Sequence, residues 1–80
     1  MPNNNQMKRI SIHLKDMQEI VGTLKELQVK NQVLIIVVQN EYQIEIPNES
    51  KLKNQLDKLF GKKIGILKAD GEFFIRKEEI

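Results

Sequence analysis

The chain has 80 residues, which is room for one domain. With 40% hydrophobic and 30% charged residues it has the composition of a folded protein rather than a disordered or fibrous one. It contains no cysteine and one histidine, which excludes disulfides, thiolate metal sites and histidine-rich metal sites. No apolar run reaches the ~18–20 residues of a membrane span, and the start is too polar for a signal peptide, so we expect a cytoplasmic protein.

The sequence also argues against an enzyme. A domain of this size has little room for the enclosed cavities of ~300–1,000 Å³ that bind small substrates. Ser11-Ile12-His13 lacks a third group to orient the histidine, and Asp70-Gly71-Glu72 is too short for a calcium loop. We therefore expect no catalytic activity, no cofactor and no bound metal.

The charge is unevenly distributed along the chain. The formal net charge is only +2, but residues 51–68 contain six lysines against one aspartate, a local net charge of +5. Residues 41–49 contain three glutamates and no basic residue. A basic region of this kind favours an anionic polymer as partner.

The N-terminal extension, residues 7–18, fits two structures. Ile10, Ile12 and Leu14 alternate as in a strand, whereas the spacing from Ile10 through Leu14 to Val21 also fits one face of a helix. We prefer a strand over residues 8–14 that is followed by a turn.

Three strands are predicted next, over residues 19–29, 33–38 and 42–46. The inward parity of the first strand changes at Lys25-Glu26, which indicates a β-bulge. The second strand is apolar at every position and rich in β-branched residues, so we expect it to be covered on both faces.

A helix follows the third strand. Its core-facing stripe, with the spacing of one helical face, consists of Leu52, Leu56, Leu59 and Phe60. Asn48 or Ser50 is expected to cap the N-terminus, and Gly61 to provide the left-handed C-terminal cap.

A hairpin ends the domain, with strands over residues 62–68 and 72–77. Asp70-Gly71 is a strong signal for a two-residue turn, because both residues tolerate positive φ. In that register the core face carries Ile64, Ile66, Phe73 and Ile75. The opposite face carries Lys63, Leu67, Phe74 and Arg76. A three-residue turn would exchange the two faces.

The resulting order is three strands, one helix and two strands. This is the order of an OB-fold, so we expect a mainly β fold with one helix, built as a small five-stranded OB-like barrel with an extra N-terminal strand or helix. The alternative is an SH3-like or Sm-like barrel. We expect a disordered tail at residues 1–6, the extension at 7–18 and the barrel at 19–80.

The chain resembles small prokaryotic or viral OB-like domains at the level of topology. The resemblance covers residues 19–77, and is carried by Gly22-Thr23-Leu24, the helix stripe and residues 61–67. It implies a polymer-binding surface across the second and third strands, framed by two loops. On this chain that surface would include Lys25, Lys30, Gln32, Tyr42 and Lys68.

The hairpin suggests a second set of binding residues. Phe74 could stack a base while Lys63 and Arg76 hold its phosphate. The alternatives are that Phe74 and Leu67 pack under another segment or at an interface, and that Tyr42 belongs to the edge of the core.

Two functions follow as expectations. The first is a non-enzymatic module that binds single-stranded DNA or RNA weakly and largely without sequence preference. The alternative is a protein-interaction or assembly module that forms a homodimer or binds a protein partner. It would use the hairpin face, with Leu67 and Phe74, or an edge strand near Ile10 and Ile12.

Overall fold

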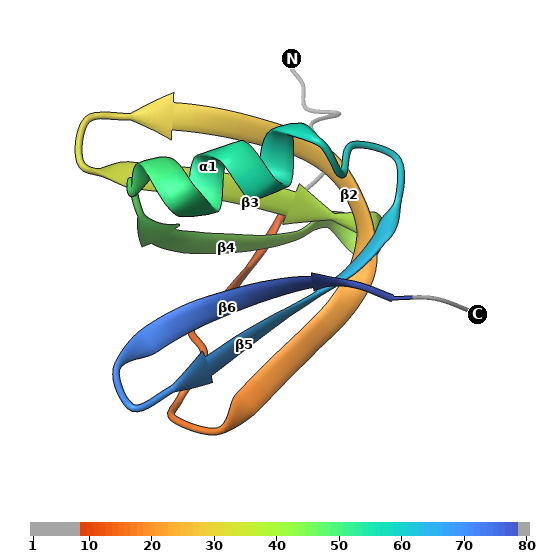
Figure 1. Cartoon of the computed structure of the whole chain (residues 1–80). Coiled ribbons are helices and arrows are strands. Elements are labelled where there is room, and N and C mark those ends of the chain that lie inside the picture. The colour runs from red at the N-terminus through yellow and green to blue at the C-terminus, as the bar shows by residue number, and fades with distance from the viewer. Residues whose placement is uncertain (1–8, 79–80) are drawn as a thin grey trace, which may run out of the picture.

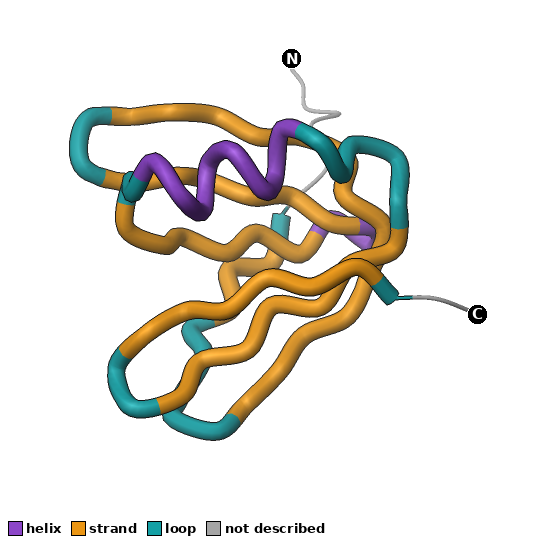
Figure 2. Tube along the Cα trace, viewed as in Figure 1, coloured by secondary structure: helices purple, strands orange, loops and turns teal. Residues whose placement is uncertain are grey.

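The structure, a computed structural model, describes residues 9–78 and shows a mainly β fold with one α-helix in that range (Figure 2). Its elements in chain order are β1 (Ile10–Ile12), β2 (Gln18–Lys30), β3 (Val33–Val38), a 3-10 helix (Gln39–Glu41), β4 (Tyr42–Pro47), α1 (Ser50–Asp57), β5 (Lys63–Ala69) and β6 (Glu72–Lys77). The predicted fold class and order of elements are confirmed. The predicted tail at residues 1–6 lies outside the described residues. In the range 9–78 no helix has the length and apolar character needed to cross a membrane.

The strands form one mixed sheet in the order β1-β4-β3-β2-β5-β6. All neighbours are antiparallel except β1 and β4, which are parallel. The long β2 pairs with β5 through its first half and with β3 through its second half, so the sheet folds back on itself (Figure 1). The result is barrel-like but not closed, because β6 forms one end of the sheet and β1 the other.

The bend in β2 explains how one strand serves both halves of the sheet. The register with β3 shifts between Leu24 and Glu26, which confirms the predicted bulge. Nearby, a Cβ added to Gly22 would lie 3.1 Å from the Cβ of Val38. Glycine at this position therefore lets β2 approach the end of β3 closely.

The core lies between the two halves of the folded sheet. Leu52 and Leu56 of α1 are buried with strand residues that include Leu34, Ile36 and Ile66. The β1 segment is a strand, as preferred from its alternation, and Ile12 packs against the same core. α1 covers the core beside β6, so the helix sits next to the open edge of the sheet.

The hairpin has the predicted register. Leu67 lies opposite Phe74, Ile66 lies opposite Ile75, and the turn residues Asp70 and Gly71 both have positive φ, of 54° and 76°. The predicted assignment of faces is therefore confirmed.

Three predictions about the helix ends are wrong. α1 ends at Asp57, so Phe60 lies beyond it with 48% of its surface exposed instead of in the core. Gly61 has the expected positive φ but does not cap α1, whose C-cap is Lys58. At the other end the N-cap is Glu49 without a side-chain bond. The Asn48 side chain donates instead to the carbonyl of Asn31, 3.1 Å away, which ties the helix start to the β2–β3 turn.

Candidate nucleic-acid interface

A tight turn after α1 places an aromatic ring at the surface. The N–H of Lys62 donates to the carbonyl of Leu59 at 3.0 Å, and Gly61 has a φ of +77°. These are the features of a type II turn, which puts Phe60 at its corner. The N–H of Gly61 also donates to the carbonyl of Leu24 at 3.0 Å, while Leu59 packs against the core. The turn is thus held on both sides, and the half-exposed Phe60 ring projects from a fixed base.

Three lysines accompany this ring. Lys58, Lys62 and Lys63 are exposed, and none of them forms an ion pair within residues 9–78. Asp57, the nearest acidic residue in the sequence, is 2.9 Å from Lys53 one helical turn earlier. Glu78, whose N–H donates to the carbonyl of Lys63 at 2.8 Å, has its carboxylate 2.9 Å from Arg76. We call residues 58–63 the basic turn. It combines an aromatic face with three available cations.

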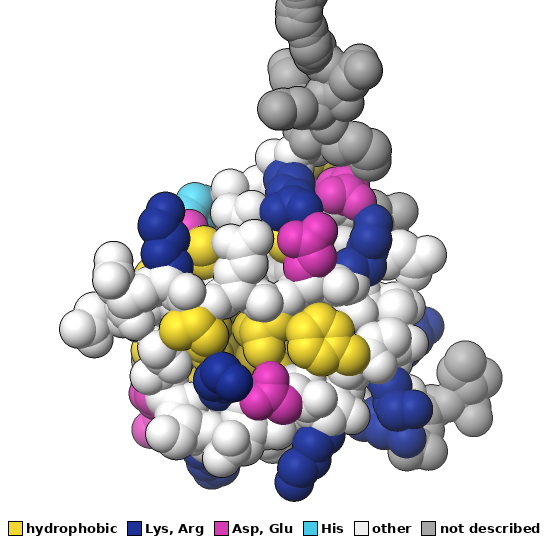
Figure 3. All heavy atoms as spheres, turned by 90° about the horizontal axis from the view of Figure 1, so that it is seen from above, with side chains coloured by type: hydrophobic (Ala, Val, Ile, Leu, Met, Phe, Trp, Pro, Cys, Tyr) yellow, Lys and Arg dark blue, Asp and Glu magenta, His cyan; other side chains and the backbone are white. Residues whose placement is uncertain are grey.

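The molecular surface shows the same combination on a larger scale. Viewed from above, hydrophobic side chains form a band across the side that carries α1 and the second half of β2 (Figure 3). Basic side chains lie on both sides of this band, with acidic side chains among them. The exposed large apolar residues include Val29 of β2, at 51%, and Phe60, which follows α1.

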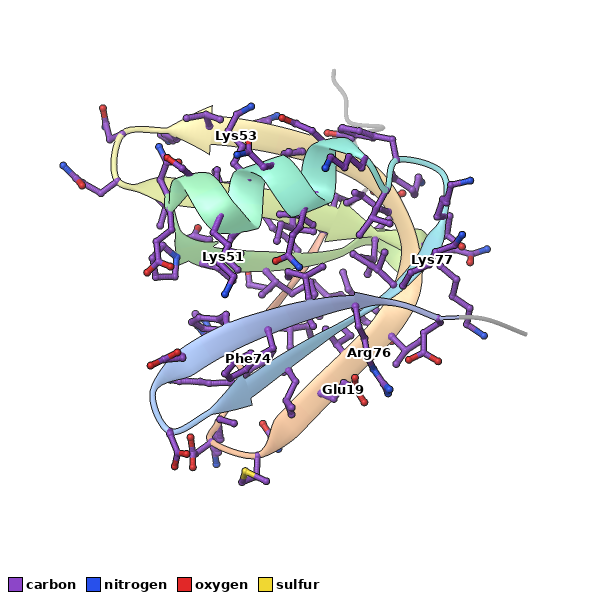
Figure 4. The ribbon with its side chains drawn as sticks, viewed as in Figure 1. Glu19, Lys51, Lys53, Phe74, Arg76 and Lys77 are labelled. Atoms are coloured by element: carbon purple, nitrogen blue, oxygen red, sulfur yellow. The ribbon has the colours of Figure 1, made fainter. Side chains whose placement is uncertain are left out.

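The outer face of the hairpin also presents an aromatic ring, but its cation is occupied. Phe74 is 48% exposed and lies opposite Leu67. Arg76 donates to both carboxylate oxygens of Glu19, at 3.1 and 3.3 Å, and is 2.9 Å from Glu78 (Figure 4). The hydrogen bonding of Arg76 to the Glu19 carboxylate is the main reason that the pKa of Arg76 is raised above its ordinary value. A phosphate at this position would have to compete with two carboxylates.

Gly65 makes this ion cluster possible. It is buried in β5 between Val21 of β2 and Arg76 of β6. A Cβ at this position would lie 2.6 Å from Oε2 of Glu19. The absence of a side chain lets Glu19 reach across β5 to the arginine.

A second ion cluster surrounds the bulge. Lys25 donates to Glu41, and Arg9 lies 2.6 Å from Glu26 and 3.5 Å from Glu41. The hydrogen bond from Lys25 is the largest factor that lowers the pKa of Glu41, followed among the lowering factors by the positive charges of Lys25 and Arg9. Lys25 therefore has a carboxylate partner already.

The remaining predicted site residues lie in three separate places, none of them at the basic turn. Tyr42 is half-buried against the core, and the ammonium of Lys68 lies 5.6 Å from the ring centre of Phe73 on the core-facing side of the hairpin. Lys30 and Gln32 are exposed at the β2–β3 turn, at the opposite end of the molecule from the basic turn (Figure 1). The structure does not bring the eight predicted residues into one site, and Lys63 is the one that belongs to the basic turn.

Sequence reasoning missed Lys58, Phe60 and Lys62. The signal was present in the run Lys-Leu-Phe-Gly-Lys-Lys, where an aromatic residue and a turn glycine stand among lysines. It was hidden because Phe60 continued the helical spacing of the core stripe.

Comparisons with models of protein families, with curated protein sequences and with solved structures find no match for this chain. In the range 9–78 no group of three or more acidic or histidine side chains is placed to hold a metal ion.

Proposed function

We propose that the chain is a non-enzymatic module that binds single-stranded nucleic acid, weakly and with little sequence preference, through the basic turn. The observation that carries this proposal is the half-exposed Phe60, which lies within a few residues of three exposed lysines that have no carboxylate partner in the range 9–78. Stacking of a base on an aromatic ring contributes ~1–3 kcal/mol and tolerates any base, because every base has a π face. Single strands are favoured because their bases are free to leave their own stack.

The lysines provide the second part of the proposed interaction. Lys62 closes the tight turn of residues 59–62, and Lys58 and Lys63 flank it, so we expect the three charges to act on one short stretch of nucleic-acid backbone. Lysine contacts phosphates as a point charge and releases the counterions bound to them. Affinity should therefore fall steeply with salt.

The alternative site on the hairpin stays a prediction. Phe74 is as exposed as Phe60, but Arg76 next to it is bonded to Glu19 and Glu78. Binding of a phosphate there would replace existing ion pairs of Arg76 with new ones, so the gain in binding free energy would be smaller than at the basic turn. For this reason we place the main contact at the basic turn.

A salt series tests the proposal. Fluorescence anisotropy with labelled DNA and RNA strands of about 20 nucleotides covers the site sizes of about 4–16 nucleotides known for OB-like domains. The expected log–log slope is about −0.7 for each phosphate contacted. No change in anisotropy at low salt, or an affinity independent of salt, would reject the proposal.

Matched lysine variants locate the contact. The double substitution Lys62→Gln with Lys63→Gln should make the slope less negative by about 1.4, because two phosphate contacts are lost. Lys25→Gln with Lys53→Gln removes the same charge from lysines that already have carboxylate partners. This second pair should leave the slope nearly unchanged, and an equal effect of both pairs would indicate attraction by net charge alone.

A second candidate function is assembly into a homodimer through the outer face of the hairpin. It is favoured by a group of partly or half-exposed apolar residues on adjacent strands, namely Val21, Leu67 and Phe74. Light scattering across a concentration series tests it, together with circular dichroism to check the fold. A dimer that dissociates on Phe74→Glu would support assembly, whereas a monomer at all concentrations would reject it.

A further inference from the structure

A groove of about 390 Å³ lies where the barrel stays open, between α1 and β6. Its buried and half-buried lining includes Leu52, Phe73 and Ile75, and its exposed lining includes Glu49, Lys51 and Glu72. Lys51 lies on the side of α1 that faces β6 (Figure 4). The groove is thus apolar at its base and charged at its rim.

One wall of the groove is the edge of a strand. Within the described residues β6 pairs with β5 and with no other strand. The N–H of Glu78 donates to the carbonyl of Lys63 at 2.8 Å, which fixes the alternation along the hairpin. Even-numbered residues of β6 direct their backbone groups to β5, so Phe73 and Ile75 direct their N–H and C=O groups away from it. Both residues line the groove.

We propose that this groove binds an extended segment of a partner protein, which adds to the edge of β6 as a further strand. An extended backbone is the ligand that satisfies a row of alternating donors and acceptors. The segment would match the five consecutive β6-side residues that line the groove, 71–75. Its apolar side chains would alternate, so that one set faces the apolar base of the groove.

The fold already uses strand addition at this opening. β1 is a three-residue strand that pairs in parallel with Tyr42–Ile44, the first half of β4, and so fills part of the space beside it. The groove lies further along, where Pro47 at the end of β4 is among its lining residues. A bound segment would fill the part of this opening that β1 leaves empty.

The residues around the groove indicate which kind of molecule it would bind. A second copy of the chain would bring β5 with its β6, which is bulkier than a single extended segment at a groove that α1 flanks. The exposed lining contains Glu49 and Glu72 against Lys51, which disfavours a nucleic acid and favours a peptide with basic residues. The proposal is therefore independent of nucleic-acid binding at the basic turn.

A defined peptide tests this inference. The probe is a labelled peptide Lys-Val-Thr-Val-Thr-Val-Lys, with two versions that are N-methylated either at the valines or at the threonines. Because the N–H groups of alternate residues point to the same edge, only one version loses the bonds to β6. The two versions should differ in affinity by at least about tenfold, the value of one or two hydrogen bonds. Equal affinities, or no binding by the unmethylated peptide, would overturn the proposal.

Hydrogen exchange measured by NMR gives a readout at the residues concerned. In the free protein the amides of Phe73 and Ile75 should exchange faster than those of Phe74 and Arg76. Addition of the peptide should slow exchange at Phe73 and Ile75. Protection of both amides in the free protein that rises with concentration would assign the edge to a second copy instead.

Two tryptophan variants separate the groove from the helix surface. Gln55→Trp fills the groove and should weaken peptide binding at least about tenfold, whereas Asn54→Trp changes the exposed neighbour, which does not line it. Both should keep the affinity for single strands, which depends on the basic turn. Loss of oligonucleotide binding in Gln55→Trp with the fold intact would show that the groove binds nucleic acid, against the proposal. Failure of nucleic-acid binding in the wild type would leave the peptide result unaffected.

Discussion

The basic turn and the outer face of the hairpin each present one phenylalanine, Phe60 and Phe74, with the same exposed fraction of 48%. They differ in their cations. The lysines of the basic turn have no ion-pair partner within residues 9–78, whereas Arg76 on the hairpin is bonded to two carboxylates. From this comparison we infer that an aromatic residue beside a cation is not sufficient for the proposed phosphate binding, because the charge must also be available.

Glycine has opposite effects at the two places. Gly61, with its positive φ, creates the turn that exposes Phe60. Gly65 leaves the space that lets Glu19 neutralise Arg76 across β5. Both sites therefore depend on backbone features as much as on the side chains that would contact a ligand.

The largest expected effect is a loss of stability when a buried residue of α1, the helix that precedes the basic turn, is changed. Leu56 is fully buried, so Leu56→Ala should lower the free energy of unfolding by about 2–5 kcal/mol through lost burial and a cavity. Chemical denaturation measures this loss, with Phe74→Ala as the control on the exposed hairpin face. Equal losses in the two variants would contradict the assignment of α1 to the core.

A smaller effect is expected from releasing Arg76 from one of its two carboxylates, that of Glu19. In Gly65→Ala the new Cβ would displace the Glu19 carboxylate from its position 2.6 Å away, and the bond to Arg76 would be lost. Glu19→Gln removes the negative charge of this carboxylate without adding a side chain to β5. Either change should make the salt slope of oligonucleotide binding more negative by up to about 0.7, the contribution of one phosphate contact. An unchanged slope in both variants would show that the carboxylate does not occupy a potential phosphate site.

The smallest expected effect is a pH dependence at the bulge. Because the pKa of folded Glu41 lies below its ordinary value of 4.5, its ion pair with Lys25 stabilises the fold above that pH, and the contribution is lost as the pH falls through the lower, folded pKa. An NMR titration of the Glu41 carboxyl should show the pKa rise towards its ordinary value in Lys25→Gln. An unaltered titration would mean that the pairing of Lys25 with Glu41 does not persist in solution.

The sequence predicted the strands well because the relevant signals are local. Alternation of apolar residues, or for residues 33–38 a continuous β-branched run, located the strands of the sheet. Asp70-Gly71 determined the hairpin register and hence the position of Phe74. The parity change at Lys25 was sufficient to predict the bulge.

The parts that the sequence could not predict depend on distant contacts or on where helical bonds stop. Phe60 keeps the helical spacing, but α1 ends three residues earlier, and spacing alone does not mark that end. Arg76 and Glu19 are 57 positions apart, so local patterns gave no sign of their ion pair. The open edge of β6 likewise follows from β1 pairing with β4.

The most direct test of the central claim compares Phe60→Ala with Phe74→Ala in the same titration with a labelled single strand at low salt. Each variant removes a ring of equal exposure, so general effects of losing apolar surface are matched. We expect Phe60→Ala to weaken binding by about 5- to 150-fold, the equivalent of ~1–3 kcal/mol of stacking, and Phe74→Ala to change it little. Weaker binding in Phe74→Ala with Phe60→Ala unaffected would contradict the account and move the site to the hairpin.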